Sequence, residues 1–464
     1  MLTFSHSLRC KSLLVPLLVC VTVLSGCATS RDVPMLIADM PSRWMATVMQ
    51  QAAAPRDDWW RAFGDPALDR LIEDALRTNN DLAVAAIRVY RAQLQAGLAD
   101  TNLTPNVTLR ASSDVSRTLD TNDTSRAASI RGTLGYELDL WGKLAAQRDV
   151  ARWALEATQA ECDAARLSLI GTTASLYWRI GYLNRLIALG DANVADAERT
   201  LAIVRSRYAA GALSGLDVAQ AEQDLSVQRA TQTQWLRQRT ESRNALAILF
   251  DRPPNTVAGE PTTLPDRALP DIAAGLPAEL LSRRPDLRVA ESQLRESLAN
   301  VDVVRTSFYP SFTLTGTAGT TSVSLARVLQ NPVGTLGVGL ALPFVEWNTM
   351  QLQIKVSKTQ YEEAVVRFRQ NLYRALAEVE NGLAAREQFD REANDLQQSL
   401  SQAQRAEAIA KARFRARATG VQPWLDQQQR LRDAQRAMAL NTLNRLRVRM
   451  ELFQALGGGA APSA

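Results

Sequence analysis

The sequence predicts an α+β membrane protein in which one structural unit, a β-hairpin followed by a long α-helical hairpin, occurs twice. Three observations lead to this prediction. The 464-residue sequence repeats itself after nearly half its length, and each half has a long stretch with helical apolar periodicity. Each half also has two segments in which apolar and polar residues alternate, as in half-buried strands. Each chain would therefore contain four transmembrane β-strands and two coiled-coil helical hairpins.

The internal repeat is visible in four pairs of matching positions. Their residue numbers differ by 205 in the first two pairs and by 206 in the last two. The pairs are Asp81 and Asp286, Pro105 and Pro310, Trp141 and Trp347, and Tyr208 and Phe414. So small a drift indicates a duplicated unit, and we expect repeat 1 over 59–250 and repeat 2 over 278–456. A crossover with six prolines over 251–277 joins them, and residues 457–464 form a flexible tail.

The first 26 residues have the composition of a secretory signal peptide. Basic Arg9 and Lys11 precede an apolar run that is too short for a membrane-spanning helix. The run ends in Leu24-Ser-Gly-Cys27, which resembles the bacterial lipobox, where the cysteine becomes the lipidated first residue. We therefore expect residues 1–26 to be removed, a covalent lipid on Cys27 to anchor the chain, and residues 27–58 to form an irregular tether.

The mature chain would lack the side chains that most catalytic sites need. The only histidine, His6, lies in the signal, and loss of the signal leaves Cys27 and Cys162 as the only cysteines. Zinc sites and catalysis by a nucleophile paired with histidine are thereby excluded, whereas a carboxylate-pair hydrolase stays open on residue types. Charges of both signs are interspersed, so the net charge of +5 does not indicate nucleic-acid binding. We expect a protein that is not an enzyme and has no cofactor other than the lipid.

Residues 143–208 contain no proline and are predicted to form one uninterrupted helix. Apolar or small residues recur at alternating intervals of four and three from Leu176 to Tyr208, the 3.5-residue repeat of supercoiled helices. The second half repeats this pattern from Val365 onward. A glycine-containing turn and a returning helix follow each long helix. We therefore expect helical hairpins over 143–250 and 349–456.

A β-hairpin is predicted ahead of each long helix, over about 106–141 and about 310–346. One strand face is apolar and the other is polar, which is typical of outer-membrane barrels, although a soluble sheet packed on helices would alternate in the same way. The polar face of the first hairpin has mixed charges that select for no obvious solute: Arg110, Asp114, Arg131, Glu137 and Asp139. Four strands cannot close a barrel, and three chains would supply twelve.

Several segments together resemble the outer membrane factor family typified by TolC and OprM, and in particular its NodT-type efflux lipoproteins. The matching segments are Trp59-Trp-Arg-Ala-Phe-Gly-Asp-Pro-Ala-Leu-Asp69, Tyr136-Glu-Leu-Asp-Leu-Trp-Gly142, Arg284-Pro-Asp-Leu-Arg-Val-Ala-Glu291 and Tyr309-Pro-Ser311. With the repeat, the resemblance covers nearly all of residues 55–456. It implies a homotrimer with a twelve-stranded barrel in the outer membrane and a helical tunnel across the periplasm.

The resemblance also implies a function and partners. The chain would be a passive exit duct for drugs or other small compounds, docked to a periplasmic adaptor and an inner-membrane pump of the resistance-nodulation-division type. An outer membrane duct for secreted proteins is an alternative, and a structural envelope lipoprotein without a pore is another. Adjacent adaptor and pump genes, or their absence, would distinguish these classes.

The family pattern assigns functional positions to the tips of the helical hairpins. The residues implied to contact the adaptor are Tyr208, Gly211, Ser214, Leu216, Phe414, Thr419 and Gly420. Candidates for the periplasmic aperture are Asp217, Arg417 and Asp426. The first tip matches the family pattern well. The second departs from it, because Arg417 replaces the usual glycine and Gln422 the usual leucine.

Overall fold

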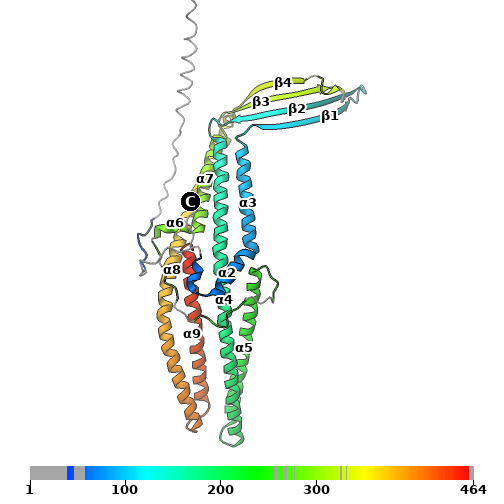
Figure 1. Ribbon diagram of the computed structural model, residues 1–464. Coiled ribbons are helices and arrows are strands. Elements are labelled where there is room, and N and C mark those ends of the chain that lie inside the picture. The colour runs from blue at the N-terminus through cyan, green and yellow to red at the C-terminus, as the bar shows by residue number, and fades with distance from the viewer. Residues whose placement is uncertain are drawn as a thin grey trace, which may run out of the picture. The chain divides into compact units, whose positions relative to one another are not determined.

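The computed structural model describes residues 39–45, 58–254, 259–265, 269–272, 274–275, 277–323, 327–330 and 332–458. Its contacts divide the chain into Met1–Asp39 and Met40–Ala464, and every element named below belongs to the second unit (Figure 1). The expected signal peptide, Cys27, most of the tether and the last six residues lie outside the described residues.

The order of helices and strands repeats in the two halves. Repeat 1 consists of η1 (Trp59–Phe63), α2 (Pro66–Thr78), α3 (Asn80–Thr101), β1 (Asn106–Arg117), β2 (Thr124–Leu138), α4 (Lys143–Ala209) and α5 (Gly215–Leu249). Repeat 2 consists of η2 (Pro277–Glu279), α6 (Leu280–Arg283), α7 (Pro285–Thr306), β3 (Ser311–Ser322), β4 (Pro332–Ala341), η4 (Pro343–Val345), α8 (Trp347–Arg415) and α9 (Gln422–Ala455). Helix, two strands and two long helices thus recur as predicted.

Both predicted β-hairpins extend further at their C-terminal ends than the strands in the structure do. The strand expected to continue to 346 ends at Ala341, because Pro343 has no N–H for a ladder hydrogen bond and begins the short helix η4. The strand expected to reach 141 ends at Leu138. The Leu140 N–H donates to the Leu138 carbonyl at 2.9 Å, so the backbone already turns toward α4.

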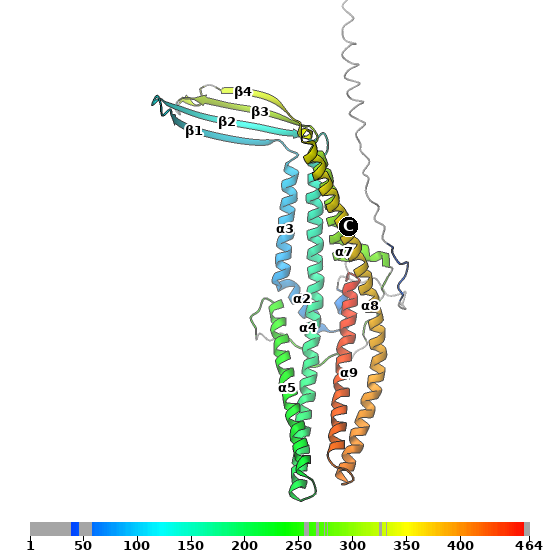
Figure 2. The same cartoon turned by 180° about the vertical axis from the view of Figure 1, so that it is seen from behind.

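The long helices α4 and α8 are 67 and 69 residues long, so each extends roughly 100 Å. Each packs against the helix that follows it, and both views show α4 beside α5 and α8 beside α9 (Figures 1 and 2). The predicted 3.5-residue seam is confirmed, since Ile180, Leu183 and Val204 are fully buried. At Gly190 a Cβ atom would lie 2.8 Å from the Trp235 ring, so only glycine permits this close approach of α5. Within the described ranges, no helix has an apolar segment long enough to cross a membrane.

The four strands form one antiparallel sheet in the order β1-β2-β3-β4. The central β2–β3 pair joins the two repeats, and β1 and β4 are edge strands. The register places Leu134 opposite Val107 on one side and Gly316 on the other, and Leu314 opposite Tyr136 and Val338. The apolar residues of all four strands therefore share one face, as the alternation predicts. This face is uncovered in the single chain, and Leu336 is 92% exposed.

A buried arginine joins the start of α7 to the second helical hairpin. The Arg284 guanidinium donates to both carboxylate oxygens of Asp286, at 2.9 and 2.7 Å, and to Glu378 at 2.7 Å. It also donates to the Ala455 carbonyl at the end of α9, at 3.0 Å. Burial of such a charge is tolerated because every side of the guanidinium is hydrogen-bonded. These contacts explain why an Arg-Pro-Asp segment stands at this position.

Aromatic residues of η1 lie in the packed centre of the helical region. Trp59 stacks on Phe453 of α9 with ring centroids 5.0 Å apart, and Phe63 lies 4.9 Å from Trp178 of α4. The segment around Trp59 therefore attaches the start of repeat 1 to helices of both repeats. Because these contacts involve α4 and α9, they brace the two helical hairpins that end in the tips.

Candidate functional site at the helical-hairpin tips

The first tip is a tight turn between α4 and α5. Gly211 has a φ of +72°, and its N–H donates to the Tyr208 carbonyl at 2.9 Å. The Ala212 N–H donates to the Arg207 carbonyl at 2.9 Å. This pair of hydrogen bonds is a Schellman motif, which satisfies the last carbonyls of the helix and needs a left-handed residue after it. Glycine fits that position without steric cost.

The second tip has the same turn without the glycine. The Ala418 N–H donates to the Arg413 carbonyl at 3.0 Å, and the Arg417 N–H donates to the Phe414 carbonyl at 3.1 Å. Arg417 has a φ of +62° and stands 206 residues after Gly211, in the same position of the motif. A left-handed conformation costs an L-residue about 1–2 kcal/mol. The departure from the family pattern at Arg417 therefore places backbone strain in the second turn.

Asp217 is the third residue of α5 and completes the N-terminal cap that Ser214 begins. Its carboxylate accepts hydrogen bonds from the Ser214 N–H at 2.9 Å and the Ser214 hydroxyl at 2.7 Å, and its own N–H donates to that hydroxyl at 3.4 Å. These bonds form a capping box. The hydrogen bonds from the hydroxyl and the N–H of Ser214 lower the pKa of Asp217. Asp217 therefore stays ionised at neutral pH and holds the turn of the first tip through Ser214.

Phe414 belongs to the contact between the tips, so its assignment to an adaptor-binding surface is wrong for its side chain. Phe414 is fully buried, whereas Tyr208 at the matching position of repeat 1 is 52% exposed. The Arg207 guanidinium covers the Phe414 ring at 4.4 Å and donates to the Phe414 carbonyl at 2.8 Å. The Phe414 ring also stacks on the ring of Trp424 of α9, with ring centroids 5.2 Å apart. The side chains of Arg207 and Trp424 therefore cover the Phe414 ring and keep it away from solvent.

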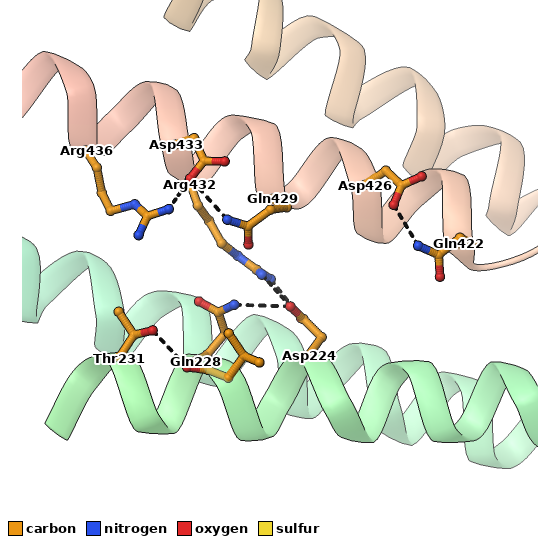
Figure 3. A network of polar contacts seen from close by, with 10 residues as sticks. Asp224, Gln228, Thr231, Gln422, Asp426, Gln429, Arg432, Asp433 and Arg436 are labelled. Atoms are coloured by element: carbon orange, nitrogen blue, oxygen red, sulfur yellow. Dashed lines mark hydrogen bonds and ion pairs between the residues drawn. The ribbon is translucent and has the colours of Figure 1, made fainter. Parts of the chain in front are cut away.

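A nearly buried ion pair joins α5 to α9 behind the tips (Figure 3). The Arg432 guanidinium donates to the two carboxylate oxygens of Asp224 at 2.6 and 3.0 Å. The Gln228 amide donates to the same carboxylate at 3.1 Å. The Arg432 side chain is 6% exposed and that of Asp224 is 15% exposed, so water screens the pair little. A two-pronged contact of this kind fixes the relative position of the two helices.

The tip residues therefore fall into two groups. Tyr208, Gly211, Ser214, Leu216 and Gly420 are exposed, with Leu216 at 68%, and Thr419 is half-buried. The aperture candidates Arg417 and Asp426 are also exposed, and Asp426 accepts a hydrogen bond from Gln422 at 2.7 Å. Beneath them lies a core with residues from α4, α5, α8 and α9 and from the turn before α9: Ala197, Leu201, Val204, Ala221, Leu225, Phe414, Val421, Trp424 and Leu425.

The sequence reasoning missed the residues that connect the two hairpins. Asp224 binds Arg432 and Arg207 binds the Phe414 carbonyl across the two hairpins, while Trp424 stacks on Phe414 within the second hairpin. A signal for Arg432 exists in the sequence, since it falls seven residues after Leu425 and seven before Ala439. A charge at an apolar position of a heptad repeat indicates a specific partner on a neighbouring helix.

Paired helical hairpins ending in exposed tips, together with a sheet that has an apolar face, characterise membrane channels of the outer membrane efflux type. The chain belongs to the outer membrane efflux protein family, whose family model matches residues 71–250 and 276–458. These matches cover both repeats. The family is one of channel proteins and not of enzymes.

Individual relatives agree with this assignment. The pyoverdine export outer membrane protein OpmQ of Pseudomonas putida is 32% identical over 448 residues, which cover 94% of this chain and 95% of OpmQ. The open-state crystal structure of the Neisseria gonorrhoeae MtrE outer membrane channel is 29% identical, with a TM-score of 0.78, and the match covers 91% of this chain and 98% of MtrE. The Campylobacter jejuni CmeC outer membrane channel has the same fold, with 24% identity, a TM-score of 0.86 and coverage of 94% and 95%. This chain is thus an efflux channel of the outer membrane.

Proposed function

We propose that three copies of this chain form one exit duct, with a closed barrel of twelve strands in the outer membrane and a helical tunnel below it. The observation that supports this most directly is the four-stranded sheet, because each of its edge strands, β1 and β4, lacks a partner strand on its outer side among the described residues. An unpaired edge beside an apolar face is unstable in lipid, because each free N–H and C=O there would lack a hydrogen-bond partner. Pairing β1 of one copy with β4 of the next satisfies both edges.

The proposed duct has no chemistry of its own and receives cargo from other proteins. The exposed tip residues Tyr208, Gly211, Ser214 and Leu216, with Thr419 and Gly420, form the surface for a periplasmic adaptor. Arg417, Asp426 and Asp217 lie at the periplasmic aperture. An inner-membrane pump of the resistance-nodulation-division type would deliver small compounds, in line with the name of OpmQ, which concerns pyoverdine export. A lipid on Cys27 would anchor each chain to the outer membrane.

Disulfide cross-linking tests the barrel. In a Cys162→Ser background, a cysteine replaces Thr108 of β1, and a second one replaces Val333, Thr335 or Gly337 of β4 in turn. Oxidation should give covalently linked trimers for at least one of these pairs. The control replaces Thr133 and Thr317, which lie opposite each other within the chain, and should give only cross-linked monomers. If every β1–β4 pair stays monomeric, the shared barrel is refuted.

Conductance of the purified trimer in a planar bilayer tests the duct. A structural lipoprotein without a pore would give a trimer with no ion current under any condition. A duct for secreted proteins would conduct as well, so a second measurement is needed. In a host lacking its own channel, co-expression with a pump of the resistance-nodulation-division type and its adaptor should restore resistance to small toxic compounds. Restoration of protein secretion in place of resistance would favour the alternative.

Two substitutions test the attachments. After signal cleavage, the N-terminal peptide of the wild-type chain should carry the added mass of the lipid. Cys27→Ser should remove that added mass. Leu216→Asp should weaken adaptor cross-linking because it places a charge in an exposed apolar contact, whereas Leu119→Asp in the strand turn should not. Equal adaptor cross-linking in both variants would exclude the first tip as the docking surface.

A further inference from the structure

The strand register brings two arginines together on the polar face of the sheet. Arg110 of β1 lies directly opposite Arg131 of β2, and Arg131 lies directly opposite Gly319 of β3. Directly opposed residues of an antiparallel pair point to the same face, with Cβ atoms about 4.5–5.5 Å apart. The two guanidinium groups therefore occupy one level of the sheet, although 21 residues separate them in the sequence.

The acidic residues of the same face lie at other levels. Asp114 is four residues along β1 from Arg110, and Glu137 is six along β2 from Arg131, so about 13 and 20 Å of extended strand intervene. Among the described residues, neither arginine forms an ion pair. The charges that look mixed in the sequence are therefore separated by level, and opposed like charges disfavour the pair unless an anion compensates them.

The neighbouring levels supply hydroxyl groups and open space. One level of threonines lies on the helix side of the arginines, and a level of hydroxyls lies on the other side. These residues are Thr108, Thr133, Thr317 and Thr335, then Ser112, Ser129 and Thr321. At Gly319 a Cβ atom would stand 2.7 Å from the Ile130 carbonyl oxygen and 3.1 Å from the Arg131 Cα, so no side chain covers that flank of Arg131.

We propose that Arg110 and Arg131 form an anion-binding belt that selects anionic solutes, such as carboxylates and phosphates, as they pass along the sheet. A guanidinium binds these groups through two parallel N–H donors, and the flanking hydroxyls can donate further hydrogen bonds. The proposal rests on the proposed function, in which the polar face lines the pore. Three chains would then place six guanidinium groups around one level of the duct. Like-charged narrow walls raise the local concentration of the opposite ion.

The test is the reversal potential of the parent channel and its variants across a bilayer with a KCl gradient. The parent should prefer chloride over potassium. Arg110→Gln/Arg131→Gln should lower the permeability ratio roughly threefold or more, since it removes the focused positive charge, and each single variant should lie between. The matched control is Arg117→Gln/Arg126→Gln, which removes the same charge from the other face of the same two strands. It should leave the ratio unchanged.

A second measurement separates binding from a general charge effect. Citrate added on one side should reduce the chloride current of the parent and of the Arg117→Gln/Arg126→Gln variant, and should lose this effect in Arg110→Gln/Arg131→Gln. A cation-selective parent, or a ratio and citrate block that do not change with Arg110 and Arg131, would overturn the belt. A parent trimer without any conductance would instead overturn the duct itself, and the belt with it.

Discussion

Asp224→Asn should loosen the contact between α5 and α9 behind the tips. The substitution keeps the shape of the side chain and removes its charge, so the Arg432 guanidinium stays buried without a counter-ion. In the parent it donates twice to the Asp224 carboxylate, at 2.6 and 3.0 Å. No packing is lost, and the effect therefore reports on the ion pair.

The magnitude follows from the burial of the pair. Removing one partner of a buried ion pair costs about 3–5 kcal/mol, because the remaining charge is left without compensation. Asparagine retains one acceptor oxygen, so we expect the lower limit, about 3 kcal/mol of local opening free energy. At about 1.4 kcal/mol per factor of ten, the opening equilibrium should rise by roughly 100-fold. The double variant Asp224→Leu/Arg432→Met should recover most of this loss, since replacing both partners by apolar residues is nearly neutral.

Hydrogen–deuterium exchange of the native protein measures the local opening. Peptides spanning 218–228 and 425–436 should exchange about 100-fold faster in Asp224→Asn, while the start of α4 stays protected. The control is Asp196→Asn, which breaks an exposed pair with Arg199 and should change exchange by less than about fivefold. The loosened tips should also raise the resting conductance. If Asp224→Asn exchanges like Asp196→Asn, the ion pair does not hold the hairpins together.

Three further predictions concern the same helices. Arg417→Gly should stabilise the second tip by about 1 kcal/mol because it relieves the left-handed strain, whereas Gly211→Ala should destabilise the first; exchange of each turn measures both. The hydrogen bonds of Ser214 lower the pKa of Asp217, so its stabilisation of the first tip is complete above the unfolded-state pKa and is lost as pH falls through the lower folded-state pKa. Acid should therefore open the first tip in the parent and not further in Asp217→Asn. Gly190→Val should lower the thermal unfolding temperature, since its side chain would overlap α5.

Contrary results would identify the faulty step. Faster exchange in Arg417→Gly would mean that the arginine side chain makes contacts that outweigh its backbone strain. Acid opening that is the same in the parent and in Asp217→Asn would assign it to another carboxylate. An unchanged unfolding temperature in Gly190→Val would mean that α4 and α5 can separate at little cost.

The predicted helices agree closely with the structure because their signal is long and periodic. A 3.5-residue repeat sustained over many turns leaves few alternatives, and the predicted 143–208 helix ends within one residue of Ala209. Strand ends were less predictable, since alternation continues through Leu140 and Phe344 although the backbone has already turned. There the hydrogen-bonding capacity of single residues, such as Pro343, decides where the ladder stops.

At the tips of the helical hairpins, the sequence predicts less of the structure than it does along the helices. Tyr208 and Phe414 occupy equivalent positions of the repeat, yet one is exposed and the other is buried. Arg207 and Trp424 cause this difference in exposure. Neither residue is among the matching positions from which the repeat was recognised. A duplicated sequence predicts equal local structure. It does not predict equal surroundings, because each copy packs against the other from a different side.

By itself the sequence determined the duplication, the long helices and the two-faced strands. Those features depend on periodicities of about 3.5 and 2 residues, which the backbone converts directly into the faces of an element. Only the tertiary structure decided which side chains meet across elements. The strand register set Arg110 opposite Arg131 and moved the acids to other levels, and the docking of two hairpins joined Asp224 to Arg432. Both pairings depend on how elements are positioned relative to one another, and no local pattern of residues records that position.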